Sequence, residues 1–175
     1  MLKPAAVKSF NEYTQQVFVS YVLSKLQQAT RLDLVWDSYS ADSLKGTVRA
    51  KRVKGVRRRV VGSASIPGNW ASFLRVDDNK TELFSFLSGA LHHSFLLEEK
   101  QLVITDGDAV FSKPSLPDTS DLSPCSHEEA DTRMMLHAAH AAHTGHNKIT
   151  IRTVDTDVVV LAVSLVRTLK EDDEV

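Results

Sequence analysis

The sequence contains one cysteine, Cys125, and it lacks any apolar run near the roughly 20 residues that cross a bilayer. A single cysteine excludes an intrachain disulfide framework and is compatible with a reducing compartment. We interpret it as a loop thiol rather than a nucleophile, because it follows Pro124 in a loop. The first residues also lack the apolar core of a secretory signal. We therefore expect an intracellular protein, nuclear or cytoplasmic, with no membrane partner.

The chain also lacks a large net charge that would draw it as a whole to nucleic acid. Its formal net charge is −1, from 21 Lys and Arg against 22 Asp and Glu. The basic residues are concentrated, however, in one segment without acids: Lys45, Arg49, Lys51, Arg52, Lys54, Arg57, Arg58 and Arg59. Such a block can neutralise phosphates. A solvated face or a nuclear-localisation patch is the alternative interpretation.

A chain of 175 residues, 42% of them hydrophobic, can bury one ordinary core, and this one shows no internal repeat. Apolar residues at helical spacing predict helices over 9–28, 70–74, 81–91 and 130–143. Clusters of β-branched and apolar residues predict strands at 32–36, 102–105 and 149–154. Residues 106–108 predict a turn. Five side chains of the middle helices are expected in the core rather than on a base-stacking surface: Trp70, Phe73, Leu83, Phe84 and Leu87.

Two short acidic clusters near the end of the chain are its most informative feature. Glu128, Glu129 and Asp131 lie where the helix over 130–143 begins, and Asp155 and Asp157 follow the predicted strand at 149–154. In open α/β sheets, ligands collect at the C-terminal ends of strands. Crowded carboxylates repel one another, and a hard cation such as Mg²⁺ relieves that repulsion. Helix capping is the competing interpretation for either cluster.

The position of Glu129 relative to the helix leaves two possibilities open. Ser126 and Glu129 have the spacing of a capping box, which would make Glu129 structural and Glu128 the better ligand. On a regular helix, Glu128 and Asp131 share a face, whereas Glu129 and Asp131 point roughly oppositely. A ligand role for Glu129 therefore requires it to act from just before the helix.

These motifs resemble those of the PIN-like 5′-nuclease superfamily, which includes flap endonucleases and exonuclease-1-type enzymes. Residues 129–132, Glu-Ala-Asp-Thr, are similar to the family's helical Glu-Ala-Glu/Asp-Ala, and Asp155-Thr156-Asp157 is similar to its Asp-x-Asp. Residues 34–37, Leu-Val-Trp-Asp, resemble its strand that ends in a metal-site Asp before a basic gateway. More narrowly, residues 127–133, His-Glu-Glu-Ala-Asp-Thr-Arg, resemble a group of uncharacterised, often multicopy animal proteins with this nuclease-like core.

The resemblance implies hydrolysis of phosphodiesters in DNA or RNA with Mg²⁺ or Mn²⁺ as the cofactor. It assigns the catalytic and metal-binding roles to five acids, with Glu128 as the alternative ligand: Asp37, Glu129, Asp131, Asp155 and Asp157. It assigns the phosphate contacts to Lys45 and Arg52, and Arg49, which could share a helical face with them in the basic block, is the third expected contact. The fold that it implies is α/β, a three-layer α/β/α sandwich with a mainly parallel central sheet.

Parts of the family pattern have no match in this chain. Members begin with a strand that bears the first metal-site Asp, and they carry a further Asp on a later strand, so we expect a domain truncated at both ends. Residues 1–175 are interpreted as a single partial domain, with a basic arch-like segment at 38–62 and a helical insertion and loop at 63–125.

The missing acids affect the function that we expect. A site with fewer carboxylates should bind a second metal ion poorly, so cleavage by this chain alone is expected to be weak or absent. The alternative is a degenerate, non-catalytic module that binds nucleic acid or protein. A fragment without independent function is a third possibility. Oligomeric state and the choice between DNA and RNA are left open.

Four histidines recur every third residue near the end of the predicted helix: His137, His140, His143 and His146. Helical geometry spreads such residues over a wide arc, whereas a zinc motif uses an i, i+4 pair with a third ligand. We therefore expect a solvent-facing polar stripe, extended by Glu129 and Arg133, rather than a zinc site.

Overall fold

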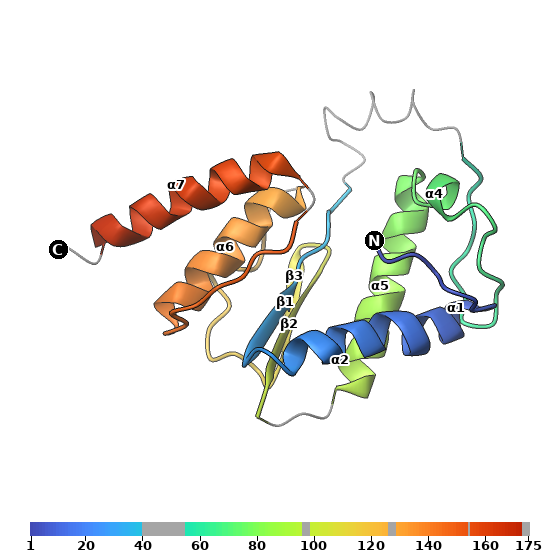
Figure 1. Ribbon diagram of the computed structural model, residues 1–175, viewed down its shortest axis with the longest axis horizontal. Helices are drawn as coiled ribbons and strands as arrows, with labels where there is room; N and C mark the ends of the chain where they lie inside the picture. Colours follow the sequence, from blue (N-terminus) through green and yellow to red (C-terminus); the bar gives the residue numbers. More distant parts are fainter. Residues whose placement is uncertain (40–54, 96–98, 126–128, 154, 173–175) are drawn as a thin grey trace.

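The structure is a computed structural model, and it describes residues 1–39, 55–95, 99–125, 129–153 and 155–172. The helices are α1 (Phe10–Glu12), η1 (Tyr13–Val19), α2 (Ser20–Leu26), α4 (Trp70–Phe73), α5 (Asp77–Ser94), α6 (Ala130–His143) and α7 (Thr156–Asp172) (Figure 1). The strands are β1 (Arg31–Leu34), β2 (Gln101–Asp106) and β3 (Ala109–Lys113). This is an α/β fold with a small sheet. None of these described helices is both long and apolar enough to span a membrane.

The sheet in the described part of the chain has three strands in the order β1-β2-β3. β1 is parallel to β2, with Leu32 opposite Leu102. β2 and β3 form an antiparallel hairpin whose turn contains Gly107 at φ 56°, a conformation that glycine adopts without strain. The strand at 102–105 and the turn at 106–108 are confirmed. The sheet is mixed, however, rather than mainly parallel, because β3 adds an antiparallel pair that the sequence analysis missed.

The N-terminal helix, α1 through α2, buries a stripe of side chains spaced four residues apart: Phe10, Thr14, Phe18, Val22 and Leu26. On a regular α-helix, residues four apart are rotated by about 40°, so such a stripe would wind around the helix. The central segment η1 is a π-helix, and its i→i+5 bonding widens the turn. The wider turn keeps the stripe facing the core. The predicted helix over 9–28 therefore forms with an irregular centre.

The core lies between the N-terminal helix, α4, α5 and the sheet. The apolar side chains predicted for it are buried, with Leu83 and Leu87 fully enclosed and Trp70 and Phe73 at most 9% exposed. Phe84 is half-buried and stacks on Trp36 with ring centroids 4.5 Å apart. The prediction that these residues form core rather than a base-stacking surface is confirmed for Trp70, Phe73, Leu83 and Leu87.

β1 links the core to α6 through the alternation of its side chains. Leu32 and Leu34 pack against the hydrophobic core. Arg31 and Asp33 bond to side chains of α6 instead. Because successive side chains of a strand point to opposite faces, this four-residue strand holds the core on one face and α6 on the other (Figure 1).

The predicted strand at 149–154 is wrong for the residues that the structure describes. Residues 146–153 have no regular secondary structure. They lie close enough to α2 for the Arg152 guanidinium to sit over the Tyr21 ring, 5.1 Å from its centroid. β-Branched residues favour a strand when a neighbouring strand packs beside them, and propensity alone does not supply that neighbour. Asp155 and Asp157 consequently lie at the beginning of α7, rather than at the end of a strand.

Candidate functional site

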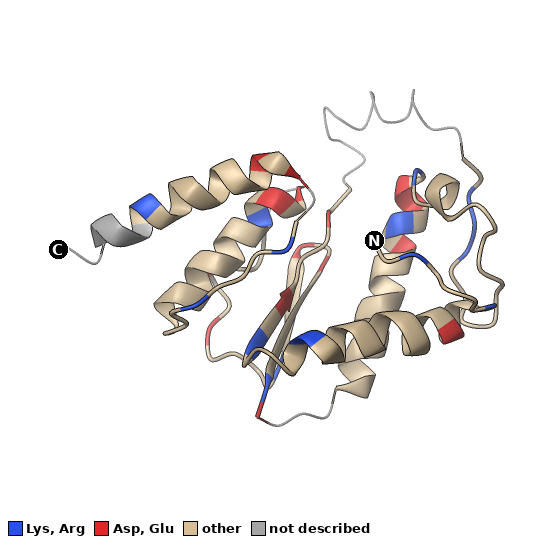
Figure 2. Cartoon of the chain, viewed as in Figure 1, with Lys and Arg blue, Asp and Glu red and all other residues tan. Residues whose placement is uncertain are grey.

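The acids singled out in the sequence come from three segments that meet where α6 and α7 begin. Asp37 follows β1, and Asp131 lies in the first turn of α6. Glu129 is the residue just before α6, with extended backbone angles of φ −87° and ψ 134°. Asp155 and Asp157 lie at the beginning of α7. Figure 2 shows acidic segments gathered at the adjacent ends of these two helices. We call these five residues the acidic cluster.

The electrostatics of Asp131 show that the cluster is close in space. Burial raises the pKa of the Asp131 carboxyl above its ordinary value, and the negative charges of the other four acids raise it further: Asp155, Asp37, Glu129 and Asp157. A like charge nearby disfavours ionisation, and this effect weakens with distance. Residues far apart in the sequence therefore share one negatively charged site.

Two acids of the cluster also stabilise helix beginnings. Asp37 Oδ1 accepts a hydrogen bond from the Ala130 backbone N–H at 2.9 Å, at the first residue of α6. Asp155 Oδ1 accepts one from the Asp157 N–H at 3.0 Å, at the beginning of α7. A carboxylate at these positions satisfies a backbone donor that the helix leaves unpaired. The Glu129 side chain makes no capping hydrogen bond. Of the two acidic clusters, the capping interpretation therefore applies to Asp155, whereas the cap of α6 comes from Asp37, for which no cap was predicted. The proposed partner of Glu129, Ser126, lies outside the described residues.

The oxygen-rich donor set has the chemistry that Mg²⁺ and Mn²⁺ prefer. The geometry of the described residues, however, does not provide the three or more converging ligands that such an ion needs. Within the described ranges, no group of three or more His, Cys, Asp or Glu side chains is arranged to hold a metal. Glu128, the alternative ligand, lies outside the described residues. The donor types fit a hard cation, whereas the described arrangement does not form a finished coordination site.

Replacing Asp131 with Asn should stabilise the metal-free protein. Its raised pKa means that the folded state disfavours the ionised carboxylate, so removing that charge at pH 7 should raise the free energy of unfolding by roughly 0.5 kcal/mol, the scale of partly exposed charge pairs. The advantage of the variant should shrink as the pH falls through the raised pKa, because Asp131 is then neutral in the wild type too. Urea unfolding in EDTA at several pH values measures this. Asp121→Asn, at an exposed loop position, is the control, and a destabilised Asp131→Asn would contradict the repulsion.

Two residues next to the cluster were missed in the sequence. The Tyr39 hydroxyl donates a hydrogen bond to Asp37 Oδ2 at 2.9 Å. The Lys80 ammonium of α5 lies 4.1 Å from the Tyr39 ring centroid and 2.9 Å from Asp77 Oδ1. A lone tyrosine two residues after an aspartate carries no pattern that would identify it. Both oxygens of the Asp37 carboxylate therefore accept a hydrogen bond, Oδ1 from Ala130 and Oδ2 from Tyr39.

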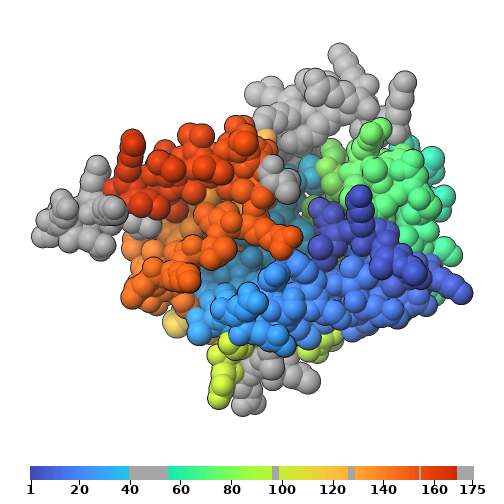
Figure 3. All heavy atoms as spheres, viewed as in Figure 1, coloured from blue at the N-terminus to red at the C-terminus, as the bar shows by residue number. Residues whose placement is uncertain are grey.

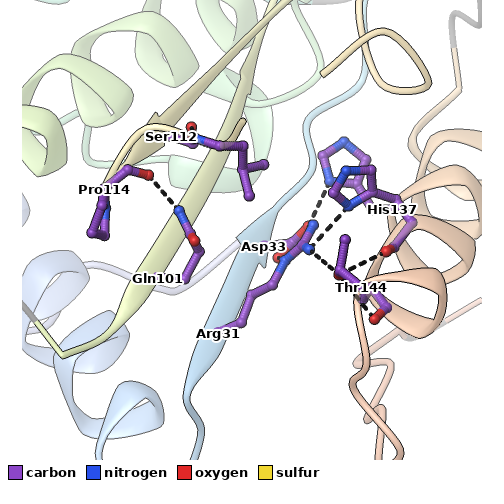
Figure 4. Close-up of polar contacts among 10 residues, drawn as sticks. Arg31, Asp33, Gln101, Ser112, Pro114, His137 and Thr144 are labelled. Carbon is purple, nitrogen blue, oxygen red and sulfur yellow. Dashed lines mark hydrogen bonds and ion pairs between the residues drawn. The ribbon is translucent and has the colours of Figure 1, made fainter. Parts of the chain in front are cut away.

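A second polar network joins α6 to β1 (Figure 4). Asp33 Oδ1 and Oδ2 accept hydrogen bonds from Arg31 at 2.7 and 2.8 Å, and Oδ2 also lies 2.7 Å from His137 Nδ1. Arg31 Nη1 lies 3.0 Å from His140 Nδ1. The side chains of Arg31 and His137 are at most 5% exposed. The expectation of a solvent-facing histidine stripe is therefore wrong for His137 and His140.

The chemistry of this network determines charge states. Arg31 can only donate, so His140 Nδ1 is the acceptor of this contact. Burial alone would raise the pKa of Asp33, but hydrogen bonds from His137 and Arg31 and their positive charges lower it below its ordinary value. Asp33 therefore stays ionised and holds β1 and α6 together.

Arg133 lies on the buried side of α6, contrary to its predicted place in the exposed stripe. It is 1% exposed, and Nη1 donates to the Gly107 carbonyl at 2.8 Å, which ties α6 to the β2–β3 turn. Its Nε and Nη2 atoms have no hydrogen-bond partner among the described residues. The contact adds a second attachment between α6 and the sheet.

The end of the basic segment is used structurally. Arg57 pairs with Glu82 of α5, and its Nε lies 3.8 Å from Asp78 Oδ2. Arg59 Nη1 lies 3.9 Å from Glu82 Oε1. These pairs neutralise the arginines locally, so they are poor candidates for phosphate contacts. The three predicted phosphate contacts lie outside the described residues: Lys45, Arg49 and Arg52.

Comparisons of the chain with protein-family models, with curated proteins and with solved structures find no match. The acidic cluster is therefore interpreted from its own chemistry.

Proposed function

We propose that this chain is a nuclease-like domain whose acidic cluster attracts Mg²⁺ or Mn²⁺ and acts on phosphodiesters of DNA or RNA. The observation that carries the proposal is the raised pKa of Asp131, caused by burial and by four other acids from three segments. Such repulsion costs free energy that surface acids ordinarily avoid by lying apart, and a bound divalent cation removes it. The proposal includes a PIN-like three-layer fold as the finer description of the α/β architecture.

In this proposal, the acids would bind the cation and the basic residues would contact the phosphates. Asp37, Glu129 and Asp131 lie around the beginning of α6, and Asp155 and Asp157 supply the negative charge at the beginning of α7. A bound divalent cation would contribute Lewis acidity and charge neutralisation at a phosphate. The predicted contacts Lys45, Arg49 and Arg52 would hold the nucleic-acid backbone by charge alone, without base specificity.

The described arrangement favours weak turnover. Asp37 and Asp155 each already accept a backbone hydrogen bond, and a metal ligand role would compete for the same carboxylates. The described residues also lack a ready group of three ligands. These observations favour the second candidate, a degenerate module that binds a cation and nucleic acid with little or no cleavage.

Asp155→Asn separates charge from capping, because asparagine keeps the Oδ1 acceptor for the Asp157 N–H and removes the negative charge. We expect Mn²⁺ or Mg²⁺ at millimolar concentration to raise the melting temperature of the wild type and not that of Asp155→Asn. Stabilisation by a ligand that binds only the folded state reaches about 2.7 kcal/mol at a hundred times its dissociation constant. Asp121→Asn, which removes an exposed acid outside the cluster, should respond like the wild type. No stabilisation of the wild type by either cation would reject the cation site.

The same proteins should then be incubated with labelled single-stranded and flapped DNA and with RNA. We expect little or no cation-dependent cleavage by the wild type. Strong cleavage that disappears in Asp155→Asn would establish an enzyme and reject the non-catalytic candidate. Cleavage that persists in Asp155→Asn would point to a contaminating nuclease or to another site.

A further inference from the structure

Arg133 is the largest side chain that the described part of the protein encloses completely, with 1% of its surface exposed. It belongs to α6, which lies between α7 and the sheet (Figure 1). In the space-filling view, α6 and α7 pack together at one end of the molecule (Figure 3). Among the described residues, the Arg133 guanidinium makes one hydrogen bond, from Nη1 to the Gly107 carbonyl at 2.8 Å. A buried cation is thus held by a single neutral partner.

The two unpartnered atoms of Arg133, Nε and Nη2, form one edge of its guanidinium. The group is planar, and the N–H bonds of this edge are parallel, so both can be donated to the same acceptor. Buried polar groups in folded proteins almost always have a hydrogen-bond partner. Two adjacent donors without one indicate an acceptor that is not part of the described chain.

The charge of Arg133 requires more than a neutral acceptor. A guanidinium does not lose its proton in a protein, and an isolated buried charge is far more costly than an unpaired neutral group. Gly107 lies between Asp106 and Asp108, and within the described ranges neither carboxylate bonds to Arg133. Asp33, the acid that joins β1 to α6, is already bonded to two other side chains. The positive charge of Arg133 is therefore uncompensated among these residues.

Another unpartnered polar atom lies one turn further along α6. His137 is 4% exposed, and its Nδ1 lies 2.7 Å from Asp33 Oδ2. Its Nε2 is buried and has no hydrogen-bond partner among the described residues. Residues four apart lie on the same face of a helix, so His137 and Arg133 share one buried side of α6. The unpartnered polar atoms are therefore concentrated between α6 and the sheet.

We propose that the Nε–Nη2 edge of Arg133 is a binding site for a small monovalent inorganic anion such as chloride. A halide ion accepts both parallel N–H bonds and supplies the missing negative charge, whereas a water molecule supplies only the acceptor. One uncompensated positive charge matches one negative charge, and the enclosure of this edge favours a monatomic ion over a phosphate. The proposal does not depend on the nuclease-like function, because it concerns a group that faces the sheet.

Thermal unfolding of the full chain in EDTA tests the site. Sodium gluconate, whose anion is bulky, keeps the ionic strength constant while chloride replaces it. We expect the melting temperature to rise by about 5 °C as chloride increases from about 1 to about 200 mM, because the ion binds only the folded state. Arg133→Gln should lose this response, and Arg59→Gln, which changes an arginine whose side chain is 82% exposed, should keep it. A wild type without a chloride-specific rise, or a folded Arg133→Gln variant that responds like it, would overturn the proposal.

Bromide locates the ion directly, since it can replace chloride and scatters X-rays anomalously. In crystals of the wild type grown with sodium bromide, we expect an anomalous peak within hydrogen-bond distance of both Nε and Nη2 of Arg133. This measurement decides the question even if circular dichroism shows that Arg133→Gln does not fold. An ordered water at this edge without an anomalous signal, or bromide at surface positions alone, would contradict an anion site.

Discussion

Replacing Asp33 with alanine should lower the free energy of unfolding by about 3–5 kcal/mol, the cost of removing one partner from a buried ion pair. Asp33 is the common acceptor for Arg31 and His137, whose side chains are 5% and 4% exposed. Without the carboxylate, the Arg31 guanidinium stays buried between β1 and α6 with no negative partner in this network. Urea unfolding followed by circular dichroism at neutral pH measures the loss.

Two controls make this result specific. Asp121→Ala removes an exposed acid and should change stability by less than about 0.5 kcal/mol. Asp33→Asn keeps one acceptor oxygen, so its loss should lie between those of the alanine variant and the control. An Asp33→Ala variant within about 1 kcal/mol of the wild type would contradict the network as a main link between β1 and α6.

The pH dependence of the Asp33 effect has a defined direction. The pKa of Asp33 is lowered in the folded protein, so its contribution is fully present above the ordinary aspartate pKa of about 3.9. It is lost as the pH falls through the lower folded value. The stability difference between wild type and Asp33→Ala should therefore shrink as the pH falls below about pH 4.

Replacing Asn79 with alanine should cost about 3 kcal/mol or more, because it removes the four hydrogen bonds of a fully buried amide, one of them to the buried Phe73 carbonyl. Asn79 is fully buried. Its Oδ1 accepts from the Arg58 backbone N–H at 2.8 Å and from Arg57 Nη1 at 3.1 Å. Its Nδ2 donates to the carbonyls of Val56 and Phe73, each at 3.0 Å. One side-chain amide thus satisfies four groups and attaches residues 56–58 to the end of α4 and the beginning of α5.

Asn79→Asp is the sharper variant, because it keeps the size of the side chain and exchanges a donor for an acceptor. The new carboxylate oxygen would face two carbonyl oxygens, so we expect a loss similar to that of alanine. Asn147→Ala, at an exposed position, is the matched control. Hydrogen exchange should show the Arg58 amide exchanging faster in Asn79→Ala, which removes its acceptor, than in Asn79→Asp, which keeps Oδ1. A global loss below about 1 kcal/mol in Asn79→Ala would contradict the role assigned to this residue.

The sequence correctly predicted the helices, strands and turns that depend on residues close together in the chain. α6 runs from Ala130 to His143, as its apolar spacing predicts, and β2 contains the whole predicted strand at 102–105. The helix depends on residues three or four apart, and the turn after β2 depends on Gly107 itself. Such causes can be read from neighbouring residues.

Contacts between distant segments could not be predicted in the same way. His137 and His140 were expected in solvent because nothing near them in the sequence could pair with them. Their partners, Asp33 and Arg31, lie 104 and 109 residues away. The strand predicted at 149–154 failed, and β3 was missed, for one reason: strand formation depends on a partner that the local residues do not specify.

The sequence predicted which residues make up the candidate site, but not how they are arranged. Four of the five acids were recognisable by their density, and Asp37 only by the resemblance of residues 34–37 to a nuclease-family motif. The structural roles of the individual acids could not be predicted, because the cap that Asp37 provides for α6 joins residues 93 positions apart. The local cap at Asp155, which joins residues two positions apart, is of the kind that the sequence does indicate.

The attachment of α6 to β1 also determines how precisely the first turn of α6, and with it Asp131, is positioned. His140 lies ten residues from Ala130, roughly 15 Å along the helix axis at 1.5 Å per residue. A tilt of roughly 5° about that anchor would move the first turn by about 1 Å, and an error of that size can cost about a hundredfold where reacting groups must be aligned. Arg31, Asp33 and the two buried histidines hold the middle and the end of α6, while the Arg133–Gly107 bond and the Asp37 cap hold its first turn, which carries Asp131. Substitutions in this polar network can therefore displace Asp131 without changing any of the five acids of the cluster.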